Sequence, residues 1–349
     1  MSILHKYGLN KYASQHEIPP LIETGRVISV HKTNYRIITE TGISLAELNG
    51  HLLFTLPAHE LPQTGDWVRI LTYNESHIIT QILSRTTTLL RKSPGKTSDV
   101  QVLAANVDTA LIIQGLDRDF NINRLERMCV SLQDSQIEPI IILNKIDLDK
   151  DWKSKVANVR SRLPNLMLIP ISAITNENLE LLHSILKPEI TYVMIGSSGV
   201  GKSTLLNALI KKDIQETKSI SSSVGKGRHT TTSRDLFLLD NGSILIDSPG
   251  VREFGLAIEN IESISLSFDD INSIGTSCHF IDCTHTTEPG CAILKAIKDG
   301  KINEDQYENY LKLRNEALHY QRTTIESKRL DRNLAKRIKK FKKQNPKSR

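Results

Sequence analysis

The first part of the chain alternates apolar and polar residues with a short period. Between residues 21 and 85, alternating or β-branched runs are broken by Gly, Pro and Asn, which is typical of strands joined by tight turns. The candidate strands read TGRVISVHKTNYRIIT, HLLFTLPA, TGDWVRIL and SHIITQIL. About four or five strands in so short a segment predict a small β-barrel, of which the nucleic-acid-binding OB-fold is one example. Other barrels are plain scaffolds, so the pattern alone leaves the role of this barrel open.

The pattern changes near residue 109, where short, fully apolar segments begin to alternate with helical ones. The strand candidates read TALIIQ, PIIILN, LMLIPI, YVMIG, DLFLLD and SILIDS, and FNINRLERMCVSLQDS and NLELLHSILK have helical spacing. Apolar strands joined by crossover helices predict a mostly parallel sheet covered on both faces. Cys129 lies on an apolar helical face, and we interpret it as a core residue.

A phosphate-binding loop is predicted within YVMIGSSGVGKSTLLNAL, which reads as a buried strand, a glycine-rich turn and the start of a helix. The turn matches G-x-x-x-x-G-K-S/T, in which backbone N–H groups and the helix dipole bind phosphates. Lys202 would reach the β- and γ-phosphates and Ser203 would bind Mg²⁺. The predicted phosphate-contacting residues are Gly196, Ser197, Ser198, Gly199, Val200, Gly201, Lys202, Ser203 and Thr204.

Two further segments after this loop fit the same chemistry. The strand ILID ends at Asp247, where an acidic residue would hold Mg²⁺ directly or through water, and the Gly250 N–H would lie near the γ-phosphate. Between loop and strand, the polar segment SSVGKGRHTTTSRD carries three successive threonines. A threonine here would complete the Mg²⁺ shell only while γ-phosphate is present; Thr231 is our candidate, with Thr230 and Thr232 as the alternatives.

The segment NKID predicts guanine as the base. The Asp147 carboxylate can accept hydrogen bonds from N1–H and the exocyclic amine of guanine, which adenine cannot supply. Asn144 can meet N7 and brace the loop, while the Lys145 stem lies along the base. One strand later, Ser172 and Ala173 occupy the position for a backbone N–H to guanine O6.

The order of these motifs is unusual, because the guanine motifs precede the phosphate loop. In an ordinary GTP-binding domain they follow it. Domain termini tend to lie close together, so old ends can be joined and new ends opened in a loop without changing the sheet. The sequence therefore predicts a circularly permuted GTPase domain.

A cysteine cluster near the end of the chain predicts a metal site. Cys278, Cys283, His285 and Cys291 form C-x4-C-x-H-x5-C, a set of four soft ligands able to close a tetrahedral structural zinc site. The adjacent His279 is the less suitable histidine. In a reducing compartment such clustering favours metal over disulfides.

Charge is distributed unevenly along the chain. Residues 328–349 hold eleven Lys or Arg and one Asp, a net of +10, which leaves −4 for the rest because the whole chain carries +6. Such a tail favours a polyanionic partner, with a merely solubilising tail as the alternative. The N-terminus has no long apolar segment and no apolar run is long enough to span a bilayer, which predicts a cytoplasmic protein without a membrane partner.

Taken together, NKID, the phosphate loop, GKGRHTTTSRD, DSPGVREFGL and the late cysteines resemble the ribosome small-subunit-dependent GTPase A family. The resemblance implies an α/β protein: an N-terminal OB-fold barrel, a circularly permuted P-loop GTPase domain and a C-terminal, mostly helical zinc-binding domain. It also implies GTP/GDP, Mg²⁺ and one structural Zn²⁺, and a late role in maturing the small ribosomal subunit through its rRNA, without a DNA partner. The expected divisions are a flexible segment 1–20, the barrel 21–90, the GTPase domain 100–256, the zinc domain 257–325 and the basic tail 326–349.

Val251 follows DSPG, where many GTPases carry a glutamine that orients the attacking water, so slow intrinsic hydrolysis is expected. Our hypothesis is that His229, the imidazole in the switch loop, positions this water once a partner orders the loop. The alternatives are a nucleotide switch that regulates a protein partner without a ribosomal role, and an ATP-dependent nucleic-acid enzyme, which Asp147 disfavours. We expect a monomer.

Overall fold

The computed structural model describes residues 2–31, 34–73, 76–92, 100–214, 234–247, 263–264 and 267–319. The chain divides into two units, Met1–Ala257 and Ile258–Arg349, and each is described by itself. Three predicted site residues, His229, Thr231 and Gly250, lie outside the described residues, as does the basic tail.

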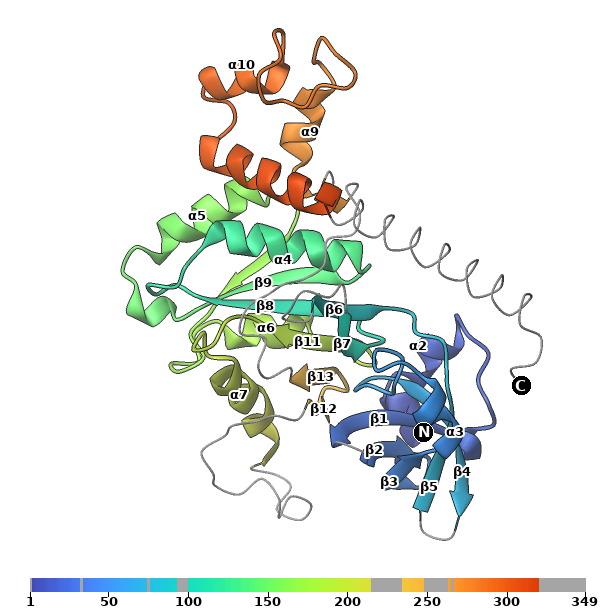
Figure 1. Cartoon of the computed structure of the whole chain (residues 1–349). Coiled ribbons are helices and arrows are strands. Elements are labelled where there is room, and N and C mark those ends of the chain that lie inside the picture. Colours follow the sequence, from blue (N-terminus) through green and yellow to red (C-terminus); the bar gives the residue numbers. More distant parts are fainter. Residues whose placement is uncertain are drawn as a thin grey trace, which may run out of the picture. The chain divides into compact units, whose positions relative to one another are not determined.

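The expected barrel is present near the N-terminus and contains five strands (Figure 1). Its strands are β1 (Thr24–His31), β2 (Asn34–Thr39), β3 (Gly42–Leu48), β4 (Trp67–Tyr73) and β5 (Ser76–Ile82). They follow the spatial order β1-β2-β3-β5-β4, and pairing of β1 with β4 closes the barrel. Val27, Ile37, Val68 and Ile79 are fully buried inside it. The apolar alternation read from the sequence is therefore that of inward-facing barrel residues.

One predicted strand of this region is a helix. HLLFTLPA was expected to extend, but Gly50–Thr55 forms α3, capped by Asn49, whose Oδ1 accepts a hydrogen bond from the His51 N–H at 2.9 Å. Leu53 and Phe54 are 44% and 89% exposed, whereas Leu52 packs against the barrel core. The local cap, rather than burial, fixes this segment.

We expected the segment 1–20 to be flexible. Two short helices, α1 (Ile3–Lys6) and α2 (Leu9–Ala13), occupy it. Leu4 and Leu9 are fully buried in the same core cluster as the GTPase sheet, and the Asn10 amide contacts Glu189. Burial of these apolar side chains fixes a segment whose sequence has no long periodic pattern.

The second half of the first unit is built on the strands that carry the motifs. They are β8 (Thr109–Gly115), β9 (Glu138–Asn144), β10 (Met167–Pro170), β11 (Thr191–Ile195), β12 (Asp235–Leu238) and β13 (Ile244–Asp247). Their spatial order is β10-β9-β8-β11-β13-β12, all neighbours being parallel except β12 and β13. Strand β12 also pairs with β1, which joins the barrel to this sheet. The mostly parallel sheet is confirmed.

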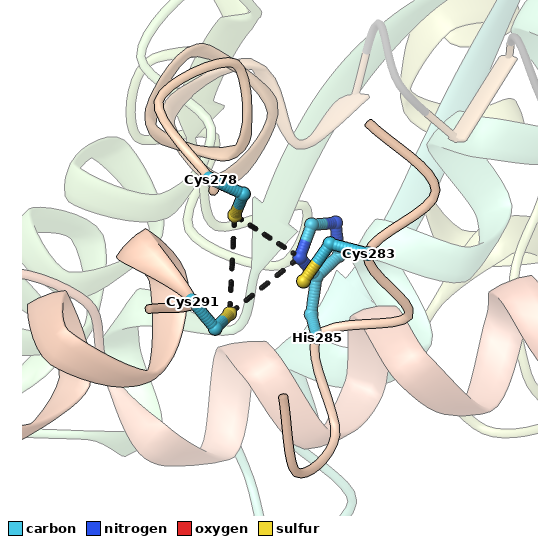
Figure 2. Close-up of side chains that lie close together, drawn as sticks. All are labelled: Cys278, Cys283, His285 and Cys291. Atoms are coloured by element: carbon cyan, nitrogen blue, oxygen red, sulfur yellow. Dashed lines mark hydrogen bonds between the residues drawn. The ribbon is translucent and has the colours of Figure 1, made fainter. Parts of the chain in front are cut away.

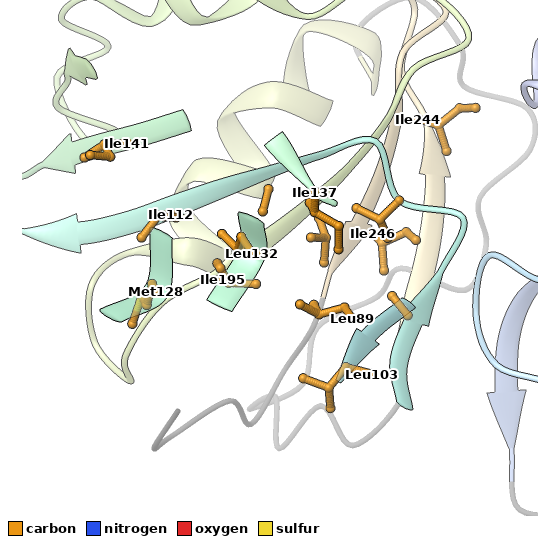
Figure 3. Packing of buried hydrophobic residues seen from close by; sticks show 14 of the residues in the cluster. Leu89, Leu103, Ile112, Met128, Leu132, Ile137, Ile141, Ile195, Ile244 and Ile246 are labelled. Carbon is orange, nitrogen blue, oxygen red and sulfur yellow. The ribbon is translucent and has the colours of Figure 1, made fainter. Parts of the chain in front are cut away.

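Helices cover both faces of the sheet (Figure 1). The helices are α4 (Ile122–Asp134), α5 (Trp152–Arg162), α6 (Leu179–Ile185) and α7 (Lys202–Ile214). On one face, Ile112, Ile141 and Ile195 pack in the same cluster as Met128 and Leu132 of α4 (Figure 3). Alternate residues of the same strands pack on the other face in a second cluster that contains α6 and α7 side chains. Both faces of the sheet are therefore buried, and Cys129 is core as predicted.

A hairpin of β6 (Thr88–Lys92) and β7 (Val100–Ala105), which the sequence pattern did not predict, links the barrel to this sheet. The second unit holds α9 (Asp269–Gly275), α10 (Ala292–Lys298) and a helix over 304–319, with Phe268 packed edge-on against Tyr310. Across the described ranges, no helix has the length and apolar character needed to cross a membrane.

Candidate functional site

The sequence motifs meet at one edge of the sheet. Strands β8, β9, β10, β11 and β13 are parallel, so their carboxyl ends lie at the same edge. NKID begins at the last residue of β9, the phosphate loop follows β11, and Asp247 ends β13. In open α/β sheets ligands bind outside this edge, where connections diverge to opposite faces.

Close backbone contacts explain the glycines of the phosphate loop. Gly196 and Gly201 have φ of 150° and 97°. A Cβ on Gly196 would lie 2.1 Å from the Ile113 carbonyl oxygen, and one on Gly201 would lie 2.4 Å from Asn144 Nδ2. Any other residue at either position would push the loop away from the strand ends beside it. The loop can therefore expose its N–H groups while staying pressed against the sheet.

Lys202 occupies the hollow of this loop. Its Nζ donates hydrogen bonds to the carbonyl oxygens of Gly196 (2.7 Å) and Ser197 (2.8 Å). Burial lowers the pKa of Lys202, and the nearby Asp247 opposes that shift. Burial also raises the pKa of Asp247, with Lys202 acting in the opposite sense. Lys202 in the loop and Asp247 at the end of β13 are therefore both partly desolvated, which suits Lys202 to bind a phosphate and Asp247 to bind a cation.

Asn144 ties the loops of the site together. Its side chain is 2% exposed. Its Nδ2 donates to the Val200 carbonyl at 2.8 Å, and its Oδ1 accepts from the Ala173 N–H at 3.0 Å. One amide therefore bridges the phosphate loop and the second guanine segment, which is the bracing expected of it. The N–H groups of Ser172 and Ala173 are both engaged within the protein, that of Ser172 with Glu177 O at 3.1 Å.

Of the other NKID residues, Ile146 is buried in the core, whereas Asp147 faces solvent. Asp147 lies in a short 3-10 turn, Ile146–Leu148, and is exposed. Lys145 has φ of 69°, and its Nζ pairs with Asp117 at 2.6 Å instead of pointing into solvent. Sequence reasoning missed Asp117, together with Asp119 and Arg124 beside it. The signal was the acidic pair in LDRD immediately after a buried strand.

The remaining predicted nucleotide residues lie around these. Ser198, Gly199, Ser203 and Thr204 are exposed, and Ser197 and Asp247 are half-buried. The structure therefore brings the described members of the predicted set to one edge of the sheet, where Ser198, Ser203 and Thr204 are exposed while Asn144 and Ser172 are buried.

In the second unit the four predicted metal ligands converge (Figure 2). Their ligand atoms all lie within 4.8 Å of one another. His285 Nδ1 is 3.6 Å from Cys278 Sγ and 3.7 Å from Cys291 Sγ, and the two sulfurs are 3.9 Å apart. A tetrahedron with zinc–sulfur bonds of about 2.3 Å and a zinc–nitrogen bond of about 2.1 Å has edges of roughly 3.6–3.8 Å. The donor set and its spacing fit zinc.

Neighbouring contacts hold the ligand loop in shape. His285 has φ of 67°, and its carbonyl accepts a hydrogen bond from the Tyr307 hydroxyl. Glu288 accepts hydrogen bonds from the Thr284 side chain and from backbone N–H groups of the loop, which lowers the pKa of Glu288 to about 2. His279, the alternative histidine, stacks edge-on against Phe280 and is not part of the cluster. These contacts orient the ligands without occupying their donor atoms.

Comparisons with known proteins agree with this geometry. A family model described as RsgA GTPase matches residues 82–257. A second, described as 50S ribosome-binding GTPase, matches 191–343, so its match begins at β11 and leaves out NKID. The small ribosomal subunit biogenesis GTPase RsgA 1 of Bacteroides thetaiotaomicron is 42% identical over 322 residues, covering 91% of this chain and 90% of that protein. The RsgA protein of Methanosarcina acetivorans is 39% identical over 326 residues, covering 91% and 87%.

Solved structures show the same fold. The crystal structure of YjeQ from Thermotoga maritima, 28% identical, superposes with a TM-score of 0.63 and covers 85% of this chain and 98% of that one. YloQ, described as a circularly permuted GTPase, is 24% identical with a TM-score of 0.61, over 87% and 98%. In this chain NKID, at the end of β9, precedes the phosphate loop that follows β11. This chain belongs to the RsgA GTPase family.

Proposed function

We propose that this chain binds and hydrolyses GTP at the carboxyl edge of its sheet and acts in maturation of the small ribosomal subunit. The observation that carries the nucleotide assignment is the Asn144 bridge, because it makes the phosphate loop and the guanine segments one site. The ribosomal assignment is supported by the names of relatives that match nearly the whole chain.

In this proposal, base recognition belongs to the loops after β9 and β10. The exposed Asp147 carboxylate accepts from N1–H and the exocyclic amine of guanine, and Lys145 lies along the base. The Ala173 N–H, with Ser172 beside it, is offered to guanine O6 by sharing its hydrogen bond with Asn144. Asn144 keeps these groups in register with the phosphates.

The phosphates are held by the N–H groups of the loop from Gly196 to Thr204 and by Lys202, which must exchange its two carbonyl acceptors for phosphate oxygens. Ser203, Asp247 and Thr231 hold Mg²⁺, which supplies positive charge to the phosphate oxygens. From the sequence, His229 positions the attacking water and Gly250 contacts the γ-phosphate.

The other parts of the chain supply contacts to rRNA. We assign these contacts to the barrel (21–90), to the domain 257–325 with zinc bound by Cys278, Cys283, His285 and Cys291, and to the basic tail 326–349. Electrostatic contacts of this kind should weaken steeply with salt. A monomeric, cytoplasmic protein without DNA or membrane partners is part of the same proposal.

Co-sedimentation tests the ribosomal assignment. The full chain is mixed with purified small subunits, or with large subunits as comparison, in the presence of GDP or a non-hydrolysable GTP analogue. Binding to small subunits that depends on the nucleotide and falls with added salt is expected. Equal binding to large subunits, or no binding at low salt while GDP still binds, would favour the alternative of a switch for a protein partner.

A further inference from the structure

The loop over 116–121, between β8 and α4, touches both halves of the proposed nucleotide site. Its backbone is fixed beside the guanine segment, because the Leu116 N–H donates to the Asn144 carbonyl at 2.9 Å. At its other end, the Gln114 amide donates to the carbonyls of Asp119 (3.3 Å) and Asn121 (3.2 Å). The sequence patterns gave this loop no role.

On the base side, the loop holds Lys145 of NKID. Lys145 Nζ lies 2.6 Å from Asp117 Oδ2, and the other oxygen of that carboxylate accepts the Asp119 N–H at 3.1 Å. The hydrogen bond from Lys145 keeps the pKa of Asp117 below its usual range, so the Asp117 carboxylate is ionised at neutral pH. The position of Lys145 is therefore set through Asp117.

On the phosphate side, the loop holds Ser197. Asp119 binds Arg124 through both oxygens, at 2.6 Å and 3.0 Å, and Arg124 Nη1 also donates to Ser197 Oγ at 2.6 Å. Ser197 is the second residue of the phosphate loop, and its carbonyl is one of the two acceptors of Lys202. The guanidinium thus braces the half of the loop that Lys202 must leave when phosphate binds.

We propose that loop 116–121 is a positioning element that couples the guanine turn at Lys145 to the phosphate loop at Ser197. The path runs from Lys145 through Asp117, Asp119 and Arg124 to Ser197, and each link is a hydrogen bond or ion pair. This inference rests on the proposed GTP site. It adds Asp117, Asp119 and Arg124 to that site as residues that act through Lys145 and Ser197 and not by contact with the base or the phosphates.

Side-chain exposure separates this role from a structural one. The side chains of Arg124 and Asp119 are 31% and 48% exposed, and those of Lys145 and Asp117 are 21% and 32% exposed. Ion pairs this open to water contribute little to folding. Their loss should therefore alter nucleotide binding and leave thermal unfolding nearly unchanged.

The test compares GDP with IDP, which lacks the exocyclic amine of guanine, on the full chain. Arg124→Met removes the phosphate-side link and Asp117→Asn the base-side link. Arg118→Met, in the same loop and exposed, is the matched control. We expect each of the first two variants to bind GDP about tenfold more weakly and to lose much of the preference for GDP over IDP. The double variant should be little worse than either single one.

The ratio of the GDP affinity to the IDP affinity tests the coupling, because Arg124 contacts the phosphate side of the site and not the base side. If Arg124→Met weakened GDP and IDP equally, the phosphate loop would be acting alone and the coupling would be refuted. Slower hydrolysis with both affinities unchanged would also overturn it. Wild-type protein that bound GDP no better than IDP or ADP would remove the guanine site itself, and the inference with it.

Discussion

In the proposed site, the choice of purine would depend on the Asp147 carboxylate, which is exposed in the turn after β9. A carboxylate can only accept hydrogen bonds, and guanine presents two donors on the edge that would face it. The side chain of the neighbouring Asn144 is hydrogen-bonded to the phosphate loop, and Lys145 is paired with Asp117. We therefore expect Asp147 to be the side chain that selects guanine over adenine at the proposed site.

Asp147→Asn should shift the base preference of the site from guanine, which has an amine at C2, toward xanthine, which has a carbonyl there. The amide donates where the carboxylate accepted, which suits the C2 carbonyl of xanthine. We expect GDP affinity to fall by about 100-fold or more, because a site's polar groups reject a base that leaves them unpaired, and XDP affinity to rise. Titration with both nucleotides measures this. Asp151→Asn, at an N-cap without a side-chain cap bond, should change neither.

The buried Asp247 carboxylate should lower the free energy of unfolding, by an amount that depends on pH. Burial raises its pKa above the ordinary value of 3.8. Between that value and the raised one, the folded state holds more protons than the unfolded state, so the unfolding free energy of the nucleotide-free protein falls as pH rises. Asp247→Asn should flatten this dependence, raise stability at pH 7 and weaken Mg²⁺-dependent GTP binding. Denaturation between pH 4 and 7 measures the first two effects, and lower stability of the variant would refute the account.

At the scale of elements, the barrel and the GTPase sheet are joined by a buried cation. Arg26 on β1 is 1% exposed and donates to the carbonyls of Gly65, Tyr7 and Asn106 and to Thr191 Oγ1. Thr191 is the first residue of β11, the strand that leads to the phosphate loop. Burial lowers the pKa of Arg26 to about 10, which leaves it charged at neutral pH.

Arg26→Met should destabilise the first unit by about 3 kcal/mol, because it leaves several buried carbonyls without a donor. Chemical denaturation followed through nucleotide release would measure it. The control is Arg69→Met on β4, whose pair with Glu23 is largely exposed and should contribute less than about 0.5 kcal/mol. Equal effects from the two substitutions would contradict the role given to Arg26.

Local signals explain which elements could be predicted from the sequence. Strands β8, β9 and β11 were found because both faces are apolar, and the phosphate loop because its glycines recur at fixed spacing. The helix over 50–55 was missed because one capping residue, Asn49, fixes it. The N-terminal helices were missed because their apolar side chains are buried by residues far away in the sequence. The contacts of Asp117 and Arg124 join residues far apart in sequence, and no local spacing encodes them.

At the scale of the whole molecule, the two units have separate sources of stability. The first is built around a sheet buried on both faces, whereas the second gathers short helices around four metal ligands. Zinc held by these four ligands, as proposed, would contribute directly to the folding free energy of the second unit, because the site does not pre-exist in the unfolded chain.

Chelation of zinc should therefore unfold the second unit and spare the first. Hydrogen exchange would report loss of protection over 267–319, while GDP binding by the first unit persists. Cys291→Ser should reproduce this result. Cys129→Ser provides the contrast, because it places a hydroxyl in the core of α4 and should weaken the first unit alone. Loss of GDP binding on chelation would contradict the independence of the two sources of stability.

We propose that GTP hydrolysis at this site is stimulated by the small ribosomal subunit. The direct measurement is steady-state GTP hydrolysis by the full chain, alone and with purified small or large subunits, at low and high salt. We predict slow turnover alone and strong stimulation by small subunits that declines with salt, as expected for a basic tail on rRNA. Stimulation by large subunits instead, or none at low salt by protein that still binds GTP, would contradict the account.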